Sequence, residues 1–501
     1  MRFLGVGILV VCFACSSNDS DSGSDDESTG GDSGTTGGRT SNGSGGAEVT
    51  GGRASSGGSA PSGGKATQGG RASTGGSSPT GGSSPTGGSG GSPPNGECRN
   101  VPTFADGLTP ERVVDIEPGD DLEAALAAAT PGTAVRLGPG SYDGGAFVSG
   151  LSGTEAAPIW VGGEPGQEKP VIEGGANALQ LSNASYVILH DLEVTGQTSN
   201  GLNIDDGGDA TDPAHHLIFR DLLIRDIGSG GNQDCLKLSG VDDYVVLDSE
   251  FIGCSGGSAI DQVGCHDGLV ARNVFSDLGG NGVQTKGGSA RIRITRNRFM
   301  NAGERAVNLG GSTGFEFFRP ALSSSEPNAE ARDIQVVANF FSGGVSPIAF
   351  VGCVDCLAAN NTLLNPERWV ARILQETTTE GEFEFAAASN GRFLNNIVIY
   401  ERANLSTHVN VGPDTEPDSF EFANNLWYAS DAPADSEPDL PVPEADGIYG
   451  ENPNLIRAPS EIGIPPASPA AGAGRMLAEV TADLEGFCYE DPPSIGAREH
   501  N

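Results

Sequence analysis

The sequence predicts an all-β fold: a right-handed parallel β-helix over residues 98–501, capped at its start by a short helix and preceded by a flexible linker. Short segments in which apolar and polar residues alternate recur after Pro102 at intervals of 22–25 residues, and each ends in Gly or Asn. About three such segments fit into one interval, and none has the period of a helix. A unit of this kind is one coil of a solenoid, in which stacked neighbours bury a continuous core.

Six of the segments align on their alternation, which separates inward-pointing from outward-pointing residues. The inward column is Leu202, Leu236, Ile260, Val283, Val307 and Ile348. The outward column is Asn203, Lys237, Asp261, Gln284, Asn308 and Ala349. The central members are 23 or 24 residues apart, and we expect inserted loops in the longer steps before Lys237 and Ala349.

A second set of segments follows at a similar period, and each contains an Asn and a Phe: 272–275, 296–299 and 338–341. Asn tolerates the left-handed conformation of a tight bend, so we expect these Asn residues at bends, where their side chains form a hydrogen-bonded ladder. The Phe residues then face the core. A leucine-rich repeat has a similar period but requires an L-x-x-L-x-L pattern, which this sequence lacks.

The first 97 residues differ from the rest. A positive charge and a short apolar run, Phe3–Phe13, are typical of a signal peptide. Ala14 before Cys15 resembles the lipobox of bacterial lipoproteins, which implies that Cys15 is lipidated and anchors the protein to the outer membrane or cell surface; an ordinary secretory signal is the alternative. Residues 16–97 are almost wholly Gly, Ser, Thr, Asp and Pro, a composition that predicts a disordered linker.

Export affects how the cysteines and the charge are interpreted. Without Cys12 and with Cys15 acylated, seven cysteines remain, an odd number that cannot pair completely. Cys353 and Cys356 have the spacing of a redox or zinc half-site, but without a second half-site a local disulfide or two buried thiols is the better interpretation. The net charge of −38 argues against a nucleic-acid partner and, globally, against an anionic substrate.

The start of the solenoid needs a cover, because open strand edges invite aggregation. Residues 120–129 predict a short amphipathic helix with an acidic first turn, closed by Pro131-Gly132. From Leu122 through Ser152-Gly153-Thr154 to Pro170–Gly174, the sequence resembles the start of pectate-lyase-like β-helix proteins, including chondroitinase B-like and alginate lyases. Residues 468–470 and 495–499 resemble the C-terminal signature of secreted β-helix proteins. The resemblance covers residues 113–499 and implies the fold and a polysaccharide-directed activity.

The outward column predicts a binding surface. Stacked coils bring its members to about 4.8 Å from one another, and Arg372 extends the row. A second outward column, two residues further on, consists of Asp205, Ser239, Val263, Lys286 and Gly310. Three long loops (205–216, 312–333 and 376–389) follow these strands and would form a wall along them. A polar row beside a wall is a groove that suits a linear polymer.

Lys286 is the leading catalytic candidate. Cleavage of a uronate polymer by elimination requires a base for the C5 proton and a cation that neutralises the adjacent carboxylate. Window 286–319 has a net charge of +5, which predicts a local cationic patch that would lower the pKa of a lysine and attract an anion. Arg305 or Arg372 would bind the carboxylate, and Lys237, Gln284 and Asn308 would contact the polymer.

The segment 283–288 resembles the lysine-bearing strand of chondroitinase B-like lyases, which implies that Lys286 is the base. Those enzymes have calcium-binding glutamates just upstream, where this chain has Leu278-Gly279-Gly280-Asn281, and an arginine one coil later, where it has Asn308. A calcium site could instead come from Asp205, Asp206 and Asp209, which are hard oxygen ligands in one Gly-containing loop.

Three functions remain open. The first is a polysaccharide lyase that cleaves an acidic glycan at Lys286. The second is a glycan-binding or adhesive surface protein without catalysis. The third is a glycoside hydrolase or epimerase in which Asp261 is a catalytic acid. For each we expect a monomer that contacts the membrane only through its lipid anchor. His215-His216 and Cys265-His266-Asp267 are expected to be ordinary turn residues.

Overall fold

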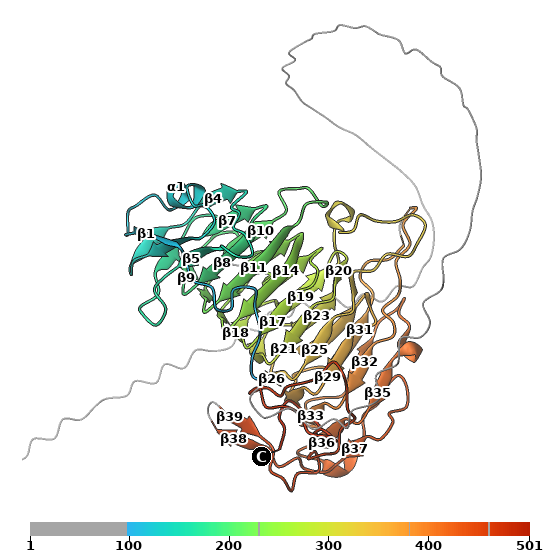
Figure 1. Cartoon of the computed structure of the whole chain (residues 1–501). Coiled ribbons are helices and arrows are strands. Elements are labelled where there is room, and N and C mark those ends of the chain that lie inside the picture. Colours follow the sequence, from blue (N-terminus) through green and yellow to red (C-terminus); the bar gives the residue numbers. More distant parts are fainter. Residues whose placement is uncertain (1–97, 229–230, 380, 459–460, 501) are drawn as a thin grey trace, which may run out of the picture. The chain divides into compact units, whose positions relative to one another are not determined.

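The computed structural model describes residues 98–228, 231–379, 381–458 and 461–500. The predicted signal peptide, the predicted lipidation site at Cys15 and the predicted linker lie outside these residues. The described chain winds into a right-handed parallel β-helix with three long sheets, and each coil contributes one strand to each sheet over most of the stack (Figure 1). Among the described residues, no helix is long and apolar enough to cross a membrane.

The first sheet has twelve strands, all parallel. They are β1 (Arg112–Ile116), β2 (Thr133–Leu137), β5 (Ile159–Gly162), β8 (Ser185–His190), β11 (Ala214–Arg220), β14 (Val241–Leu247), β17 (Leu269–Ala271), β21 (Arg293–Thr295), β25 (Gln335–Val337), β29 (Leu357–Ala359), β32 (Arg392–Leu394) and β35 (Glu421–Ala423).

The second sheet also has twelve parallel strands. They are β3 (Ser141–Asp143), β6 (Val171–Glu173), β9 (Glu193–Thr195), β12 (Leu223–Arg225), β15 (Glu250–Ile252), β18 (Val274–Leu278), β22 (Arg298–Ala302), β26 (Phe340–Ser342), β30 (Thr362–Leu364), β33 (Ile397–Tyr400), β36 (Leu426–Ala429) and β37 (Ile448–Tyr449).

The third sheet has ten parallel strands and contains the predicted site. They are β4 (Ala146–Ser149), β7 (Leu179–Ser182), β10 (Leu202–Asp205), β13 (Leu236–Ser239), β16 (Ser258–Val263), β19 (Asn281–Lys286), β23 (Arg305–Gly310), β27 (Ser346–Val351), β31 (Ala371–Leu374) and β34 (Val409–Val411).

Short elements complete the chain. The strands β20 (Ser289–Ala290), β24 (Ala331–Arg332) and β28 (Cys353–Val354) form a small parallel sheet, and β38 (Ile456–Ala458) and β39 (Glu461–Gly463) form an antiparallel hairpin. Three 3₁₀ turns are η1 (Phe315–Phe317), η2 (Pro417–Ser419) and η3 (Pro433–Asp435).

The register of the third sheet confirms the alignment made from the sequence. Leu202 pairs with Leu236, Leu236 with Ile260, and the inward column continues through Val283 and Val307 to Ile348. These side chains are buried in the central core. The outward column pairs in the same order from Asn203 to Ala349 and extends to Arg372.

The Asn and Phe residues of the second set lie inside the solenoid, as predicted, but the bends lie elsewhere. Phe251, Phe275, Phe299 and Phe341 stack face to face, with centroids 4.6–5.1 Å apart. The Asn side chains form a buried ladder that runs through Asn273, Asn297, Asn339, Asn361, Asn396 and Asn425. The left-handed residue is the one before each ladder Asn, for example Arg272, Arg296 and Ala338. The expectation that the Asn itself adopts this conformation was therefore wrong.

The helix α1 (Leu122–Ala127) covers the first coil, which confirms the predicted cap. Asp121 is its N-cap, and the Asp121 carboxylate accepts a hydrogen bond from the backbone N–H of Ala124 at 2.9 Å. Leu122 and Leu126 are buried in the core.

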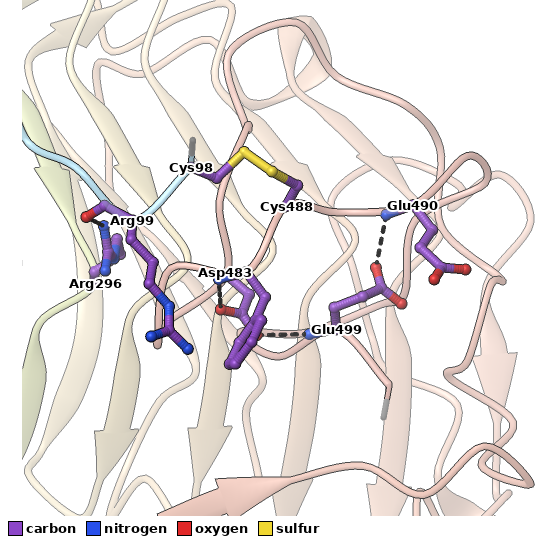
Figure 2. The surroundings of a disulfide bond; sticks show 8 residues. Cys98, Arg99, Arg296, Asp483, Cys488, Glu490 and Glu499 are labelled. Atoms are coloured by element: carbon purple, nitrogen blue, oxygen red, sulfur yellow. Dashed lines mark hydrogen bonds between the residues drawn. A yellow bond between two sulfur atoms is a disulfide. The ribbon is translucent and has the colours of Figure 1, made fainter. Parts of the chain in front are cut away.

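Three disulfides join six cysteines, Cys98–Cys488, Cys235–Cys254 and Cys353–Cys356, and Cys265 is a free, buried thiol. Of the two interpretations given for Cys353 and Cys356, a local disulfide or two buried thiols, the structure shows the disulfide. Figure 2 shows the Cys98–Cys488 bond, which links the first described residue to the C-terminal segment. Next to it, the Arg99 carbonyl accepts a hydrogen bond from Arg296 at 3.2 Å.

Candidate functional site

A cavity of about 560 Å³ lies on the outer face of the third sheet, between two of the predicted loops. Its floor comes from β13, β16 and β19, and its sides come from the loop after β10 and the loop after β23. The lining residues are Asp206, Gly208, Ala210, Asn232, Lys237, Ser239, Gly240, Val263, Lys286, Ser312, Thr313, Gly314, Glu316, Phe317, Phe318 and Arg319. Lys237 of the first outward column and Lys286 of the second therefore meet in one cavity.

The two lysines share one buried carboxylate. Lys237 Nζ contacts Asp261 Oδ2 and lies 3.3 Å from Asp234 Oδ2, and Lys286 Nζ lies 3.5 Å from Asp261 Oδ2. The Asp261 side chain is 1% exposed, against 17% for Lys237 and 13% for Lys286. Because Asp261 lies beneath the lysines and does not line the cavity, it holds the ammonium groups in place. This position argues against its predicted role as a catalytic acid that touches substrate.

The protonation of this cluster follows from burial and charge. Burial and the nearby charge of Asp261 raise the pKa of Asp234 to about 6. Burial opposes the charge on Lys237, but the carboxylates of Asp261 and Asp234 outweigh it and raise its pKa, so Lys237 is a cation at neutral pH. Asp234 lies just before β13 and outside the alternating columns, so the alternation does not mark it as a site residue.

Gln284 and Asn308 lie in the predicted row but are engaged with the protein. Gln284 accepts a hydrogen bond from Asn281 at 3.3 Å, and its amide donates to the Gly310 carbonyl at 3.4 Å. Asn308 accepts from Arg305 at 3.2 Å and also donates to Gly310. Both side chains are buried and neither lines the cavity, so the structure does not place them where they would contact a polymer there.

Arg305 and Arg372 lie on the third sheet but outside the cavity. Arg305 forms an ion pair with Glu376 at 2.7 Å. The Arg372 guanidinium lies 4.2 Å from the centre of the Trp369 ring and donates to Asn410 at 3.1 Å. Burial and the charge of Arg305 lower the pKa of Arg372. These two arginines form a second polar site further along the stack, on the same face as the lysines.

The cationic patch expected over residues 286–319 is absent as a single surface. Arg291 pairs with Asp267 on the first-sheet side, Arg298 pairs with Glu485 in the C-terminal segment, and Arg305 lies on the third sheet. A window of this length winds around more than one whole coil, so its charges point to different faces. Beside Lys286 the structure places the Asp261 carboxylate, which Lys286 shares with Lys237.

Arg319 holds the loop after β23 against the sheet. It contacts both carboxylate oxygens of Asp242, one at 2.7 Å, and donates to the carbonyls of Gly264 and Ala210 at 2.9 and 3.1 Å. The Nδ1 atom of His266 lies 3.1 Å from the Arg319 guanidinium. Because most of its N–H donors are engaged with the protein, Arg319 holds the cavity wall in place and is not a free cation for a ligand. No local sequence signal could have indicated a contact that spans 77 residues.

A buried carboxylate and an aromatic cluster fix the same wall. Glu330 accepts hydrogen bonds from the Gly287 N–H at 2.8 Å and from Thr313 at 2.7 Å, so it joins the end of β19 to the loop. Phe315, Phe318, Phe383 and Phe385 pack against one another across two loops. Phe317 lines the cavity and is 63% exposed, which leaves an aromatic ring at the cavity mouth.

The residues proposed for calcium do not converge on one point. Asp205 accepts hydrogen bonds from Gln180 at 3.0 Å and from Asn203 at 3.1 Å, while Asp206 and Asp209 accept from backbone N–H groups of their own loop. In the part of the chain that the structure describes, no group of three or more His, Cys, Asp or Glu side chains is arranged to hold a metal. The loop therefore does not fit a calcium ion as it stands.

No protein-family model and no curated protein sequence matches the chain. Solved structures that are similar to it include pectate lyase Pel9A, with 16% identity, coverage of 79% of this chain and 98% of that chain, and a TM-score of 0.45. An alginate lyase from Paenibacillus sp. str. FPU-7 has 16% identity, coverage of 61% and 97%, and a TM-score of 0.35. The A-module of the Azotobacter vinelandii mannuronan C-5 epimerase AlgE6 has 13% identity, coverage of 68% and 87%, and a TM-score of 0.39. At these identities the likeness concerns the fold alone.

Proposed function

We propose that the protein is an exported, lipid-anchored enzyme of the polysaccharide lyase type, which cleaves an acidic, uronate-containing glycan by β-elimination. The observation that carries this proposal is the cavity into which Lys237 and Lys286 both project above a shared buried carboxylate. A cation and a candidate base beside each other, on a face flanked by loops, are the groups that elimination needs.

The two lysines differ in their surroundings, and this assigns their roles. Lys237 contacts two carboxylates and is held as a cation, so it neutralises the uronate carboxylate. Lys286 has the more distant contact to Asp261, and its neutral amine form takes the C5 proton. The electron pair of the C5–H bond forms the C4–C5 double bond, the bond from C4 to the bridging oxygen breaks, and that oxygen takes a proton from water or from Lys237. Calcium enters no step, because the aspartate loop does not fit the ion.

The second polar site, which consists of Arg305 and Arg372, indicates that the proposed polymer would lie along the stack of coils. Arg305 and Arg372 lie on strands β23 and β31 of the same sheet, one and three strands beyond Lys286. At about 4.8 Å per strand, Arg372 lies roughly 14 Å from the strand of Lys286. A linear polyanion along the stack would reach both sites.

A panel of polyuronates tests the proposal. The purified protein, with and without calcium, should produce an unsaturated uronate with its ultraviolet absorbance from at least one substrate. Lys286→Ala should reduce the rate at least about a hundredfold, as expected for loss of a general base. Lys169→Ala is the matched control, because this lysine binds the Asp221 carbonyl away from the cavity and should leave the rate unchanged.

Glycan binding without catalysis is the second candidate, and the ion pairs of both lysines with Asp261 favour it, since a charged ammonium binds anions. Binding without absorbance that survives Lys286→Ala would support this candidate and overturn the lyase. Release of reducing ends without absorbance would indicate a hydrolase, and inversion at C5 without cleavage would indicate an epimerase.

A further inference from the structure

The imidazoles of His215 and His216 meet on the outer side of the first sheet, with their Nδ1 atoms 2.9 Å apart. Neighbouring residues of a regular strand point to opposite faces, so two adjacent histidines would not normally meet. Here His216 has a φ of 54°, in the left-handed region. This bend lies between Ala214 and Leu217, which both face the core, and it leaves both imidazoles on the outside. The backbone conformation therefore brings the two rings together.

Aromatic rings and a carboxylate surround the pair. The ring of Tyr186 stacks on His216 with centroids 4.5 Å apart, and Phe104 meets His216 edge-on at 6.0 Å. Asp243 Oδ2 lies 3.9 Å from His216 Nδ1, so a negative charge lies next to the pair. The aromatic contacts hold the His216 ring in position.

We propose that His215 and His216 bind a divalent transition-metal ion of the Cu²⁺, Ni²⁺ or Zn²⁺ class, with water molecules as the further ligands. Two nitrogens 2.9 Å apart, each about 2.05 Å from a metal, subtend an angle of about 90° at the ion. This is the angle of square-planar and octahedral coordination, which favours Cu²⁺ and Ni²⁺ among imidazole-binding ions. Only a small opening of the pair would give the wider tetrahedral angle of Zn²⁺.

The contact between the two rings determines how the pair is protonated. One imidazole donates its Nδ1 proton to the other in the free protein. When the metal binds, that proton moves to Nε2 of the same ring, so that both Nδ1 lone pairs face the ion and no net proton is released.

The proposed metal site is separate from the lysine cavity. Neither histidine lines that cavity, although His215 directly follows the loop that forms one of its sides. The proposal does not rest on the lyase assignment, and metal binding can be measured without any substrate.

Titration of the purified protein with CuCl₂, followed by calorimetry and electron paramagnetic resonance, tests the site. We expect one tight equivalent of Cu²⁺ with hyperfine coupling to two nitrogens. His215→Ala and His216→Asn should each weaken binding at least about tenfold, because loss of a ligand should cost no less than loss of a group that only orients one. Asn tolerates the left-handed conformation of residue 216, so the second variant keeps the bend.

His500→Ala is the matched control, since this histidine pairs with Glu499 at the other end of the described chain and should leave Cu²⁺ binding unchanged. Thermal melting of each variant checks that the fold is intact. A double variant that binds Cu²⁺ as tightly as the unaltered protein would overturn the proposal, as would the absence of a tight equivalent in the unaltered protein.

Discussion

Asp261 is the residue on which both cavity lysines depend. Its buried carboxylate is shared by two ammonium groups, and removal of a buried carboxylate leaves the paired cations uncompensated. The sequence placed Asp261 correctly in the outward column between Lys237 and Gln284, because a period of 23 or 24 residues determines which side chains are stacked. It could not reveal Asp234, since nothing in the alternation marks a residue in the turn before β13.

The raised pKa of Asp234 predicts a pH-dependent stability difference. The folded-state pKa of about 6 lies above the ordinary value of 3.8, so folding takes up a proton between these values. This contribution to stability is complete below pH 4 and is lost as the pH rises through 6. The Asp234→Asn variant has no such pH-dependent loss of stability. It retains the side-chain oxygen that accepts a hydrogen bond from the Ser258 N–H. The free energy of unfolding of this variant, relative to that of the unaltered protein, should therefore increase by on the order of 2 kcal/mol between pH 4 and pH 7. Its melting temperature should rise relative to that of the unaltered protein over the same range.

Calorimetric melting at several pH values measures this difference. Asp143→Asn, an exposed position on β3, is the control and should show no comparable trend. A flat difference for Asp234→Asn across the range would contradict the assignment.

At the scale of elements, the repeated coil was predictable and the bends were not. The period alone sets the register of the third sheet and the inward direction of Phe275, Phe299 and Phe341. The ladder Asn must keep its side chain inside to reach the coils above and below, so the residue before it makes the bend whatever its type. Arg296 and Ala338 are therefore left-handed despite being residues that rarely are.

The ladder predicts a large cost for the loss of one member. Asn339 accepts from the backbone N–H and the side-chain amide of Asn297, and its own amide donates to the Ile294 carbonyl and to Asn361. Asn339→Ala leaves several buried groups without a partner, each costing about 1–3 kcal/mol. We expect a loss of about 3 kcal/mol or more by denaturant unfolding. Asn390→Ala, at an exposed bend, should cost far less; equal losses would show that the ladder adds no special stability.

At the scale of the whole molecule, the first described residues lie beside the coil of β21 and β22, where Arg99 contacts Arg296, and not beside the first strand. Cys98 is bonded to Cys488, and the chain then crosses the outer face of the first sheet, where Ala105 packs with Trp160 and Ile188. It reaches β1 at residue 112. No periodic signal could have shown this path, because residues 98–111 lie outside the repeat and the cysteine pairing cannot be read from an odd set of seven.

The Cys98–Cys488 bond should therefore stabilise the solenoid as a closed unit. It joins residues 390 positions apart, and a cross-link over so long a loop removes much of the entropy of the unfolded chain, up to about 5 kcal/mol. The double variant Cys98→Ala/Cys488→Ala should melt at a lower temperature and be cleaved first within residues 98–111 in limited proteolysis. Cys353→Ala/Cys356→Ala is the comparison, because that bond closes a separation of 3 residues and removes little chain entropy. If both double variants lose the same stability, the Cys98–Cys488 bond stabilises the protein through local packing of its sulfur atoms. Closure of the long loop would then contribute nothing further. If only the Cys98→Ala/Cys488→Ala variant is destabilised and it is cleaved first within residues 98–111, the disulfide holds this segment against the first sheet.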